Sequence, residues 1–434
     1  MKSSKIFFFI CFILLFLGTF CQSETTTIPF TLRPITTGPV ALSLGGSSIV
    51  NIDDPYLAIQ NPSKLSLMTN SQLTLGLYSS MYKESLHFDN PHFSGSKGPT
   101  DNEFKVNYLG YCTPFRLFSM NMAAGISYYP LYTFERSISF HQNDNTQMTD
   151  QRQWNINQKG YISAISMSYA LKLHSNWSFG LSWNWVHEGF FDNQLQQEIS
   201  MTGHLNHPIQ FDEYVSQCIT HEYSGSYLDF GLMWIVSSRL KAGAVFQTRL
   251  KNSIISNRDK KECFNGNIMN SSTLVSDADH FEIPMSWGIG FCYSFIDNWN
   301  ILFDFRQIFW RQADQPNASE ANQYLSKNTE SNQDLNVHMV HLGSIYQAKH
   351  DIGGVVPIFR MGVSFCTNRG MIHPEPDESI GFGFGLVGKR LEINTGYQYQ
   401  RYEDITQNSE LAGLLRSRIR NNVIQVSLTY RFTK

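Results

Sequence analysis

Two arginines are the side chains of this sequence best placed for ligand chemistry. Arg306 and Arg360 each lie on the more polar face of a segment whose other face is apolar. A guanidinium beside apolar side chains can hold the anionic head of an amphipathic ligand, because a buried charge without a partner is costly. Alternatively, each arginine pairs with a neighbour, since Asp304 lies two residues from Arg306 on the same face. The sequence leaves both interpretations open.

Aromatic residues around one proline form the second candidate site. Tyr128 and Tyr129 come directly before Pro130 in a segment that reads as a strand, and we expect them to contact a ligand. A proline inside a strand removes a hydrogen bond of the ladder and predicts a bulge or a break in the pairing. Pro130 is therefore a candidate for an opening in a sheet. The alternatives are a plain bulge or a girdle of interfacial aromatic residues.

Catalytic and metal-binding motifs are missing from the sequence. It contains no His-Glu-x-x-His, no Gly-x-Ser-x-Gly and no P-loop. The cysteine spacings match no metal site. The net charge of −3, with no basic stripe, argues against nucleic-acid binding. We expect no enzyme activity, no catalytic residue, no metal and no cofactor.

The first residues predict export from the cytoplasm. Lys2 and Lys5 precede an apolar run at 6–20, and small residues allow cleavage before Glu24. We interpret residues 1–23 as a signal peptide. Lipidation of Cys21 is the less favoured alternative, since Phe20 stands where a small residue is expected. No later stretch approaches the eighteen apolar residues of a membrane-spanning helix.

The composition favours a membrane β-barrel. Aromatic residues make up 14% of the chain and charged residues only 16%, whereas soluble domains carry about 25% charged residues. In the last segment Ile424, Val426 and Leu428 alternate with Gln425 and Ser427, as in a strand with lipid on one side and a polar lumen on the other.

Fourteen such segments follow one another along the chain, separated alternately by tight turns and long polar loops. An even number is typical of bacterial membrane barrels. A soluble sandwich or propeller is the alternative, but its strands are usually shorter. The segments are 73–86, 104–115, 119–140, 160–173, 177–191, 223–236, 239–250, 281–295, 298–312, 336–349, 355–368, 378–387, 390–403 and 421–432.

Two of the predicted loops carry further expectations. The loop at 192–222 is long enough to contain an extra hairpin, whereas the loop at 251–280 is predicted without strands. Cys218 and Cys263 fall in these two loops and could form a disulfide.

The stretch before the first strand predicts a compact plug. Gly45 and Gly46 allow a close approach of chain segments. Asp53 and Asp54 precede Pro55, and Asp54-Pro55 resembles a helix N-cap followed by proline at the first helical position. Asn61-Pro62 repeats that signal. We therefore predict three parts: the signal peptide, an N-terminal hatch at 24–72 and a barrel at 73–434.

This stretch resembles the N-terminal segment of the long-chain fatty acid outer-membrane transporters of the FadL/TodX type. Gln60 and Ser63 depart from the residues usual in that family. The terminal strand also resembles a barrel-assembly signal, with Phe432 two residues from the end. The residues that match the family motif are Gly38, Leu44, Gly45, Gly46, Asp53, Asp54, Asn61 and Pro62.

The resemblance implies an all-β fold, a fourteen-stranded antiparallel transmembrane barrel filled by an N-terminal hatch. It also implies a site in the cell outer membrane and passive uptake of hydrophobic compounds, most simply long-chain fatty acids. In that family a kink in the third strand opens a lateral gap, and Pro130 is the candidate here. Expected partners are such ligands, outer-membrane lipid and the barrel assembly machinery. The alternative is a non-transporting barrel that acts as a shuttle or anchoring adaptor of a secretion pathway.

Overall fold

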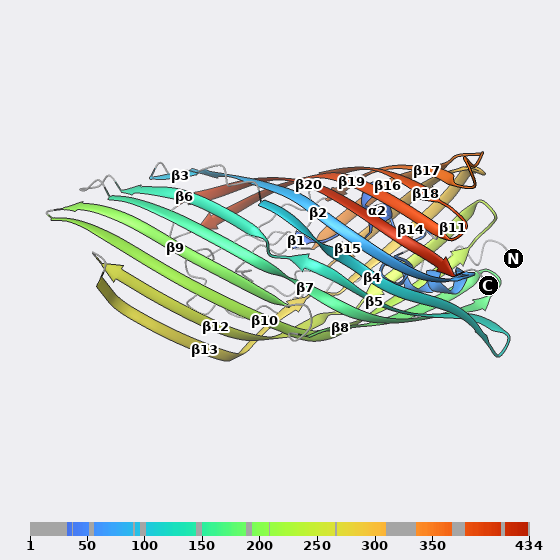
Figure 1. The fold of residues 1–434 in the computed structure, drawn as a ribbon, viewed down its shortest axis with the longest axis horizontal. Coiled ribbons are helices and arrows are strands. Elements are labelled where there is room, and N and C mark those ends of the chain that lie inside the picture. The colour runs from blue at the N-terminus through green and yellow to red at the C-terminus, as the bar shows by residue number, and fades with distance from the viewer. Residues whose placement is uncertain are drawn as a thin grey trace.

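The structure is a closed antiparallel β-barrel of fourteen wall strands (Figure 1). Consecutive wall strands pair around the ring, and the last pairs with the first, with Phe432 opposite Ser71. The predicted fold class and strand number are confirmed. The computed structural model describes residues 33–36, 38–51, 56–89, 92–95, 101–144, 150–187, 193–207, 209–264, 267–309, 336–366, 378–408 and 413–432.

The predicted signal peptide lies outside these described residues, as do Asp53, Asp54 and residues 24–32 of the predicted hatch. No described helix is both long and apolar enough to cross a membrane. The wall strands are β2 (Ser71–Phe88), β4 (Asp101–Leu117), β5 (Met120–Thr133), β7 (Asp150–His174), β8 (Trp177–Val186), β10 (Ile209–Ile235), β11 (Leu240–Gln247), β14 (Ser286–Ile296), β15 (Trp299–Ile308), β16 (Val337–Gln347), β17 (Val356–Cys366), β18 (Glu378–Val387), β19 (Leu391–Asn408) and β20 (Gly413–Phe432).

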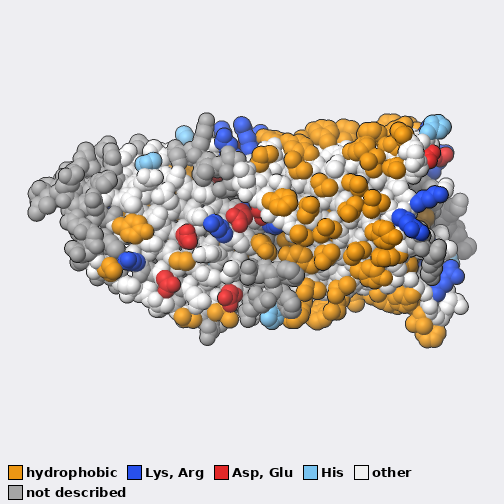
Figure 2. Space-filling model, in the orientation of Figure 1, with side chains coloured by type: hydrophobic (Ala, Val, Ile, Leu, Met, Phe, Trp, Pro, Cys, Tyr) orange, Lys and Arg blue, Asp and Glu red, His pale blue; other side chains and the backbone are white. Residues whose placement is uncertain are grey.

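Alternation along the strands places apolar side chains outside and small polar ones inside. On β20, Ile424 and Leu428 are 43% and 45% exposed, whereas Gln425 and Thr429 are fully buried. Outward apolar side chains from all around the wall form a continuous band over half of the barrel, which we call the lipid belt (Figure 2). Tight turns join the strands at this end, where Phe118 and Ser119 of the β4–β5 turn have φ of 49° and 61°.

Beyond the lipid belt the sheet continues as a long extension at the end opposite the short turns (Figure 1). Here β7 and β10 run far past the belt and pair with added strands. The added strands are β3 (Phe93–Gly95), β6 (Arg136–Asp144), β9 (Gln194–His207), β12 (Leu250–Phe264) and β13 (Asn267–Ile283).

The extension is the part of the fold that the sequence predicted least well. The extra hairpin allowed for at 192–222 is present as β9 and the first half of β10. The strandless loop predicted at 251–280 is wrong, because β12 and β13 form a hairpin there. The single segment predicted at 119–140 is also wrong, since Phe134 and Glu135 separate β5 from β6. Strands beyond the lipid need no apolar face, so they lack the alternation that marks the wall strands.

The disulfide considered between Cys218 and Cys263 does not fit the strand register. Cys218 lies opposite Asp259, and Cys263 lies opposite Tyr214. Four residues along a strand span about 13 Å, which is beyond the reach of a disulfide. Cys218 is accordingly a free thiol.

The described residues between Arg33 and Asn70 lie inside the barrel, and we call them the hatch segment. The predicted cap at Asn61 is confirmed, since its side chain accepts a hydrogen bond from the Ser63 backbone N–H and Pro62 begins the helix. The elements of the hatch segment are β1 (Arg33–Pro34), α2 (Pro39–Ser43), α3 (Leu57–Gln60) and η1 (Pro62–Leu67).

The hatch segment packs directly on the backbone of the wall, which is possible because the wall carries glycine at the contact. A Cβ atom added to Gly362 on β17 would lie 2.1 Å from the carbonyl carbon of Leu44. One added to Gly180 on β8 would lie 2.2 Å from the backbone nitrogen of Ser63. Gly45 of the hatch segment also allows close contact with the wall, since a Cβ atom added to it would lie 2.6 Å from the backbone of Val363.

We predict that Gly362→Val displaces the hatch segment. The added side chain overlaps Leu44, and overpacking of this kind costs about 1–3 kcal/mol. Single-channel recordings in planar bilayers should show a larger or noisier ionic conductance than the wild-type protein. Met361→Val is the matched control, because Met361 is the adjacent residue and faces the lipid. A Gly362→Val protein with wild-type conductance and stability would show that the contact is not tight.

Candidate functional site

A buried carboxylate on the wall fixes the middle of the hatch segment. Oδ2 of Asp304, on β15, accepts hydrogen bonds from the backbone N–H groups of Ser48 at 2.6 Å and Ile49 at 2.9 Å. Hydrogen bonds to an ionised acceptor are roughly twice as strong as neutral ones. Asp304 is therefore committed to the hatch segment, and the arginine two residues along the strand turns to a different partner. Nη2 of Arg306 donates to the hydroxyl of Ser48 at 3.3 Å.

Further polar contacts hold the same stretch of the hatch segment from both sides. Nδ1 of His341, on β16, lies 2.6 Å from the carbonyl oxygen of Gly45. Within the hatch segment, the fully buried Lys64 donates to the Ser48 carbonyl at 2.8 Å, and Asn61 donates to the Ile49 carbonyl at 2.9 Å. The described parts of this stretch, residues 45–51 and 56–61, are thus fixed to the wall and to each other, and we call them the floor of the lumen.

A cavity of about 230 Å³ lies on this floor, between the hatch segment and the wall. Its lining mixes apolar and polar side chains in similar measure, and Arg306, Asp229 and His341 provide its charged or titratable groups. The aliphatic side chains of its lining are Ile35, Ile59, Leu131, Val245, Leu250, Ile283, Ile308 and Met339.

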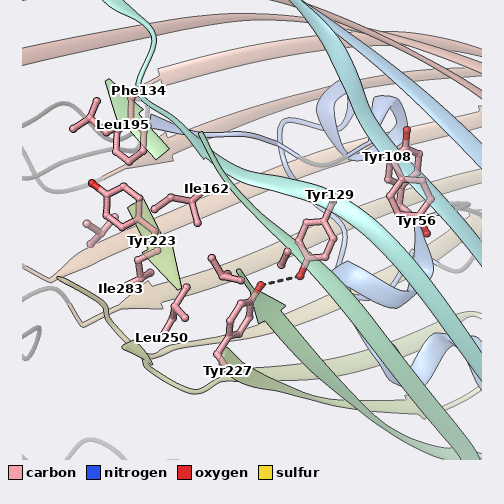
Figure 3. Packing of buried hydrophobic residues seen from close by; sticks show 13 residues of the cluster. Tyr56, Tyr108, Tyr129, Phe134, Ile162, Leu195, Tyr223, Tyr227, Leu250 and Ile283 are labelled. Carbon is pink, nitrogen blue, oxygen red and sulfur yellow. Dashed lines mark hydrogen bonds between the residues drawn. The ribbon is translucent and has the colours of Figure 1, made fainter. Parts of the chain in front are cut away.

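A chain of hydrogen bonds borders the cavity on one side. The hydroxyl of Tyr129 lies 2.8 Å from that of Tyr227 and donates to Oδ1 of Asn184 at 3.0 Å (Figure 3). Nδ2 of Asn184 donates in turn to Asp229 at 2.7 Å. These polar groups are hydrogen-bonded to one another, so that the tyrosine rings present a mainly apolar surface.

Buried apolar residues continue from the cavity toward the extension. Tyr227, Leu250 and Ile283 belong to one packed cluster with Ile162, Leu195 and other residues farther along the lumen (Figure 3). In it the rings of Phe134 and Tyr223 stack with centroids 5.5 Å apart. A packed apolar cluster therefore connects the extension to the cavity.

The wall is interrupted between β4 and β5 beside this site. β4 pairs with β5 only as far as Leu109 opposite Tyr128, although both strands continue beyond this pair. The pairing of β5 with β7 shifts register between Pro130 and Tyr132. The carbonyl of Leu131 accepts a hydrogen bond from the Ile35 N–H of the hatch segment at 2.9 Å. We call this interruption the β4–β5 gap.

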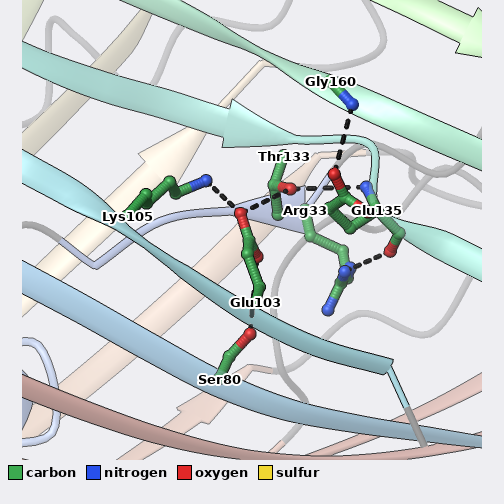
Figure 4. Close-up of polar contacts among 7 residues, drawn as sticks. All are labelled: Arg33, Ser80, Glu103, Lys105, Thr133, Glu135 and Gly160. Atoms are coloured by element: carbon green, nitrogen blue, oxygen red, sulfur yellow. Dashed lines mark hydrogen bonds and ion pairs between the residues drawn. The ribbon is translucent and has the colours of Figure 1, made fainter.

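Charged side chains surround the point where the hatch segment meets the β4–β5 gap (Figure 4). Arg33 donates to the carbonyl oxygen of Glu135, and its guanidinium lies 3.9 Å from the ring centroid of Tyr82. Glu103 forms an ion pair with Lys105 on β4. β1 is thus joined to β5 and its following residues, and the hydroxyl of Thr133 donates to Glu103 across the gap at 3.4 Å.

The predicted ligand residues separate in the structure. Arg306 and Tyr129 line the cavity, whereas Arg360 and Tyr128 do not. Arg360 pairs with Ile345 on β16, and Ile345 pairs with Asn300 on β15. Asn300 lies six residues, or about 20 Å, along β15 from Arg306. Nη1 of Arg360 donates to Asn394 at 3.0 Å. Tyr128 lies next to Tyr129 in the strand and therefore points to the opposite face.

Sequence reasoning predicted only Arg306 and Tyr129 as ligand residues of the cavity, and it missed three polar residues among the others. Tyr227, Asp229 and His341 were not among the predicted site residues, although strand alternation places all three on inward faces. The missing information was their height along the barrel, which depends on the pairing of distant strands. Among the described residues no group of three or more His, Cys, Asp or Glu side chains is arranged to hold a metal.

Comparison with solved structures supports the same architecture. The Pseudomonas putida toluene transporter TodX has a TM-score of 0.59 at 14% identity, with 92% of this chain and 99% of that chain covered. A FadL homologue from Pseudomonas aeruginosa has a TM-score of 0.60 at 11% identity, with 95% and 100% covered. The Ralstonia pickettii toluene transporter TbuX has a TM-score of 0.53 at 13% identity, with 91% and 98% covered.

Comparison with curated protein sequences gives no significant match. The family described as outer membrane protein transport protein (OMPP1/FadL/TodX) matches residues 19–433, nearly the whole chain. With its closed barrel and lipid belt, the chain therefore belongs to this family of outer-membrane channels for hydrophobic compounds.

Proposed function

We propose that this outer-membrane channel takes up amphipathic acids, of which long-chain fatty acids are the simplest example. The proposal rests on the lining of the cavity, in which the guanidinium of Arg306 lies among aliphatic and aromatic side chains as well as polar ones. Among the described residues, Nε of Arg306 has no hydrogen-bond partner although it is buried. A buried donor without a partner is costly. Nη2 makes only a 3.3 Å hydrogen bond to Ser48, so a ligand carboxylate that reaches this guanidinium would supply a stronger acceptor.

The size of the cavity and its surroundings fit such a ligand in part. At about 230 Å³, the cavity is smaller than the 300–1,000 Å³ or so of pockets that enclose drug-sized ligands. It holds a head group with the first part of a chain. The apolar cluster from Leu250 to Phe134 continues beyond the cavity, and the rest of the chain would enter by displacing its packed side chains.

Monoaromatic hydrocarbons are the second candidate ligands, because two of the similar structures are toluene transporters. A single ring is small, and it needs no cation. The two ligand classes therefore differ in their dependence on Arg306.

We predict that Arg306→Gln weakens the binding of oleate about tenfold and leaves methyl oleate and toluene unchanged. Hydrogen bonds to charged groups contribute about 1.5–3 kcal/mol, and 1.4 kcal/mol corresponds to a factor of ten. Displacement of a fluorescent fatty acid from the detergent-solubilised protein measures all three affinities. Lys241→Gln is the matched control, because Lys241 is also on an inward-facing position but does not line the cavity.

Two outcomes would contradict this assignment. Equal losses of oleate and methyl oleate affinity would show that Arg306 shapes the cavity without binding the carboxylate. Failure of the folded wild-type protein to bind any of the three ligands would favour the secretion-pathway adaptor instead.

We further propose that ligands leave the cavity sideways through the β4–β5 gap. Tyr129, Leu131 and Tyr132 of β5 line the cavity, so the cavity reaches the interrupted part of the wall. Pro130 supports the interruption because it has no N–H group to donate to a neighbouring strand.

Recognition of the last strand, with its exposed Phe432, by the barrel assembly machinery stays a prediction.

Pro130→Val should lower the rate of oleate uptake into cells several-fold while oleate binding to the purified protein is unchanged. Valine restores an N–H group and favours continued pairing in the sheet. Uptake of radiolabelled oleate measures the rate. Pro114→Val is the control, since Pro114 lies on β4 in the part that pairs with β5. Full uptake by Pro130→Val would count against the lateral route.

A further inference from the structure

A row of positive charges crosses three neighbouring strands on the outside of the barrel. Lys83 on β2 lies directly opposite Arg420 on β20, and Arg420 lies directly opposite Arg401 on β19. All three side chains are exposed. Since neighbouring strands lie about 4.8 Å apart, the three cations share a patch about 10 Å wide.

This row lies at the edge of the lipid belt. The preceding outward position on β2 is Met81, which is 44% exposed. The corresponding position on β20 is Asn422, whose Oδ1 accepts a hydrogen bond of 2.8 Å from the hydroxyl of Tyr397. Next below Asn422 comes the lipid-facing Ile424. Tyrosine is typical of the boundary between lipid and water, so the row stands at the height of lipid head groups.

The edge in question faces the outer leaflet. Short turns lie at the other end of the barrel, and the long extension rises on the side of the row (Figure 1). Outer-membrane barrels place short turns in the periplasm and longer connections outside. Figure 2 shows Lys and Arg side chains gathered where the lipid belt ends toward the extension.

Neighbouring carboxylates compensate only part of this charge. Glu378 lies 3.9 Å from Arg401, and Glu403 lies 3.8 Å from Arg401 and 3.3 Å from Arg418. Among the described residues, Lys83 and Arg420 have no ion-pair partner. Like charges directly opposite each other destabilise a sheet, and an anion between them would remove that cost.

We propose that Lys83, Arg401 and Arg420 bind the phosphate groups of phosphorylated lipids in the outer leaflet. Lipid head groups are the source of phosphate that the position favours, because the row continues directly from the lipid-facing surface. A lipid whose acyl chains lie against Met81 and Ile424 brings its head-group phosphate to Lys83 and Arg420. The outer leaflet would thereby fix the height and orientation of this face of the barrel.

The test compares binding of bisphosphorylated lipid A, dephosphorylated lipid A and inorganic phosphate to the full-length protein by native mass spectrometry. Lys83→Gln with Arg420→Gln should lower the affinity for bisphosphorylated lipid A tenfold or more, at roughly fivefold per cation near a membrane surface. Affinity for the dephosphorylated lipid should not change. Arg420→Lys, which keeps the charge, should retain most of the binding.

The control pair is Arg239→Gln with Lys389→Gln, which removes two exposed cations from the short-turn end. Unchanged heat-modifiable mobility on gels establishes that each variant is folded. The proposal is overturned if both pairs lose affinity equally, or if neither pair loses it. It is also overturned if inorganic phosphate displaces the lipid at an equal phosphate concentration, because the row would then bind free anions.

Discussion

The close contact between the hatch segment and the glycines of the wall is the constraint on which the rest of this structure depends. A side chain on Gly362 or Gly180 would occupy the space of the hatch backbone. Because these positions carry no side chain, the backbone of the hatch segment contacts the wall directly. Asp304 then fixes its height by accepting two backbone N–H groups. Without this floor the lumen would be an open polar tube, and no cavity would form.

The same contact explains how Arg306 comes to line the cavity. Asp304 binds the hatch segment, and this leaves Arg306 with a single polar contact at Ser48 and a buried Nε without a partner. The tyrosine hydroxyls and Asn184 satisfy one another, so their rings close the cavity without offering strong polar contacts. Arg306 beside the apolar part of the lining suits a ligand with one anionic group and an apolar chain.

The wall of the barrel was predictable because lipid imposes a period of two on it. β20 shows this directly, with Ile424 and Leu428 outside and Gln425 and Thr429 inside. The cap at Asn61 was predictable for a local reason, since its side chain bonds only two residues away. β12 and β13 were not predicted, because strands beyond the lipid carry polar residues on both faces.

The site was predictable only in part. Alternation along a strand predicts on which face of the wall a side chain lies, but not its position along the barrel axis. Arg306 and Arg360 both face inward, yet strand register separates them by six residues along β15. Only Arg306 reaches the cavity. His341 and Asp229 join it from strands far apart in the sequence, and no local pattern reports that. Register between distant strands is the information that the sequence lacks.

A crystal structure of the protein with a terminally brominated sixteen-carbon fatty acid would test the central claim most directly. Anomalous scattering locates the bromine, and ordinary density locates the carboxylate. We expect a carboxylate within hydrogen-bonding distance of Arg306, with the acyl chain leading from the cavity along Leu250 and Ile283. Bromine found only on the lipid belt, with the cavity empty at saturating ligand, would contradict it.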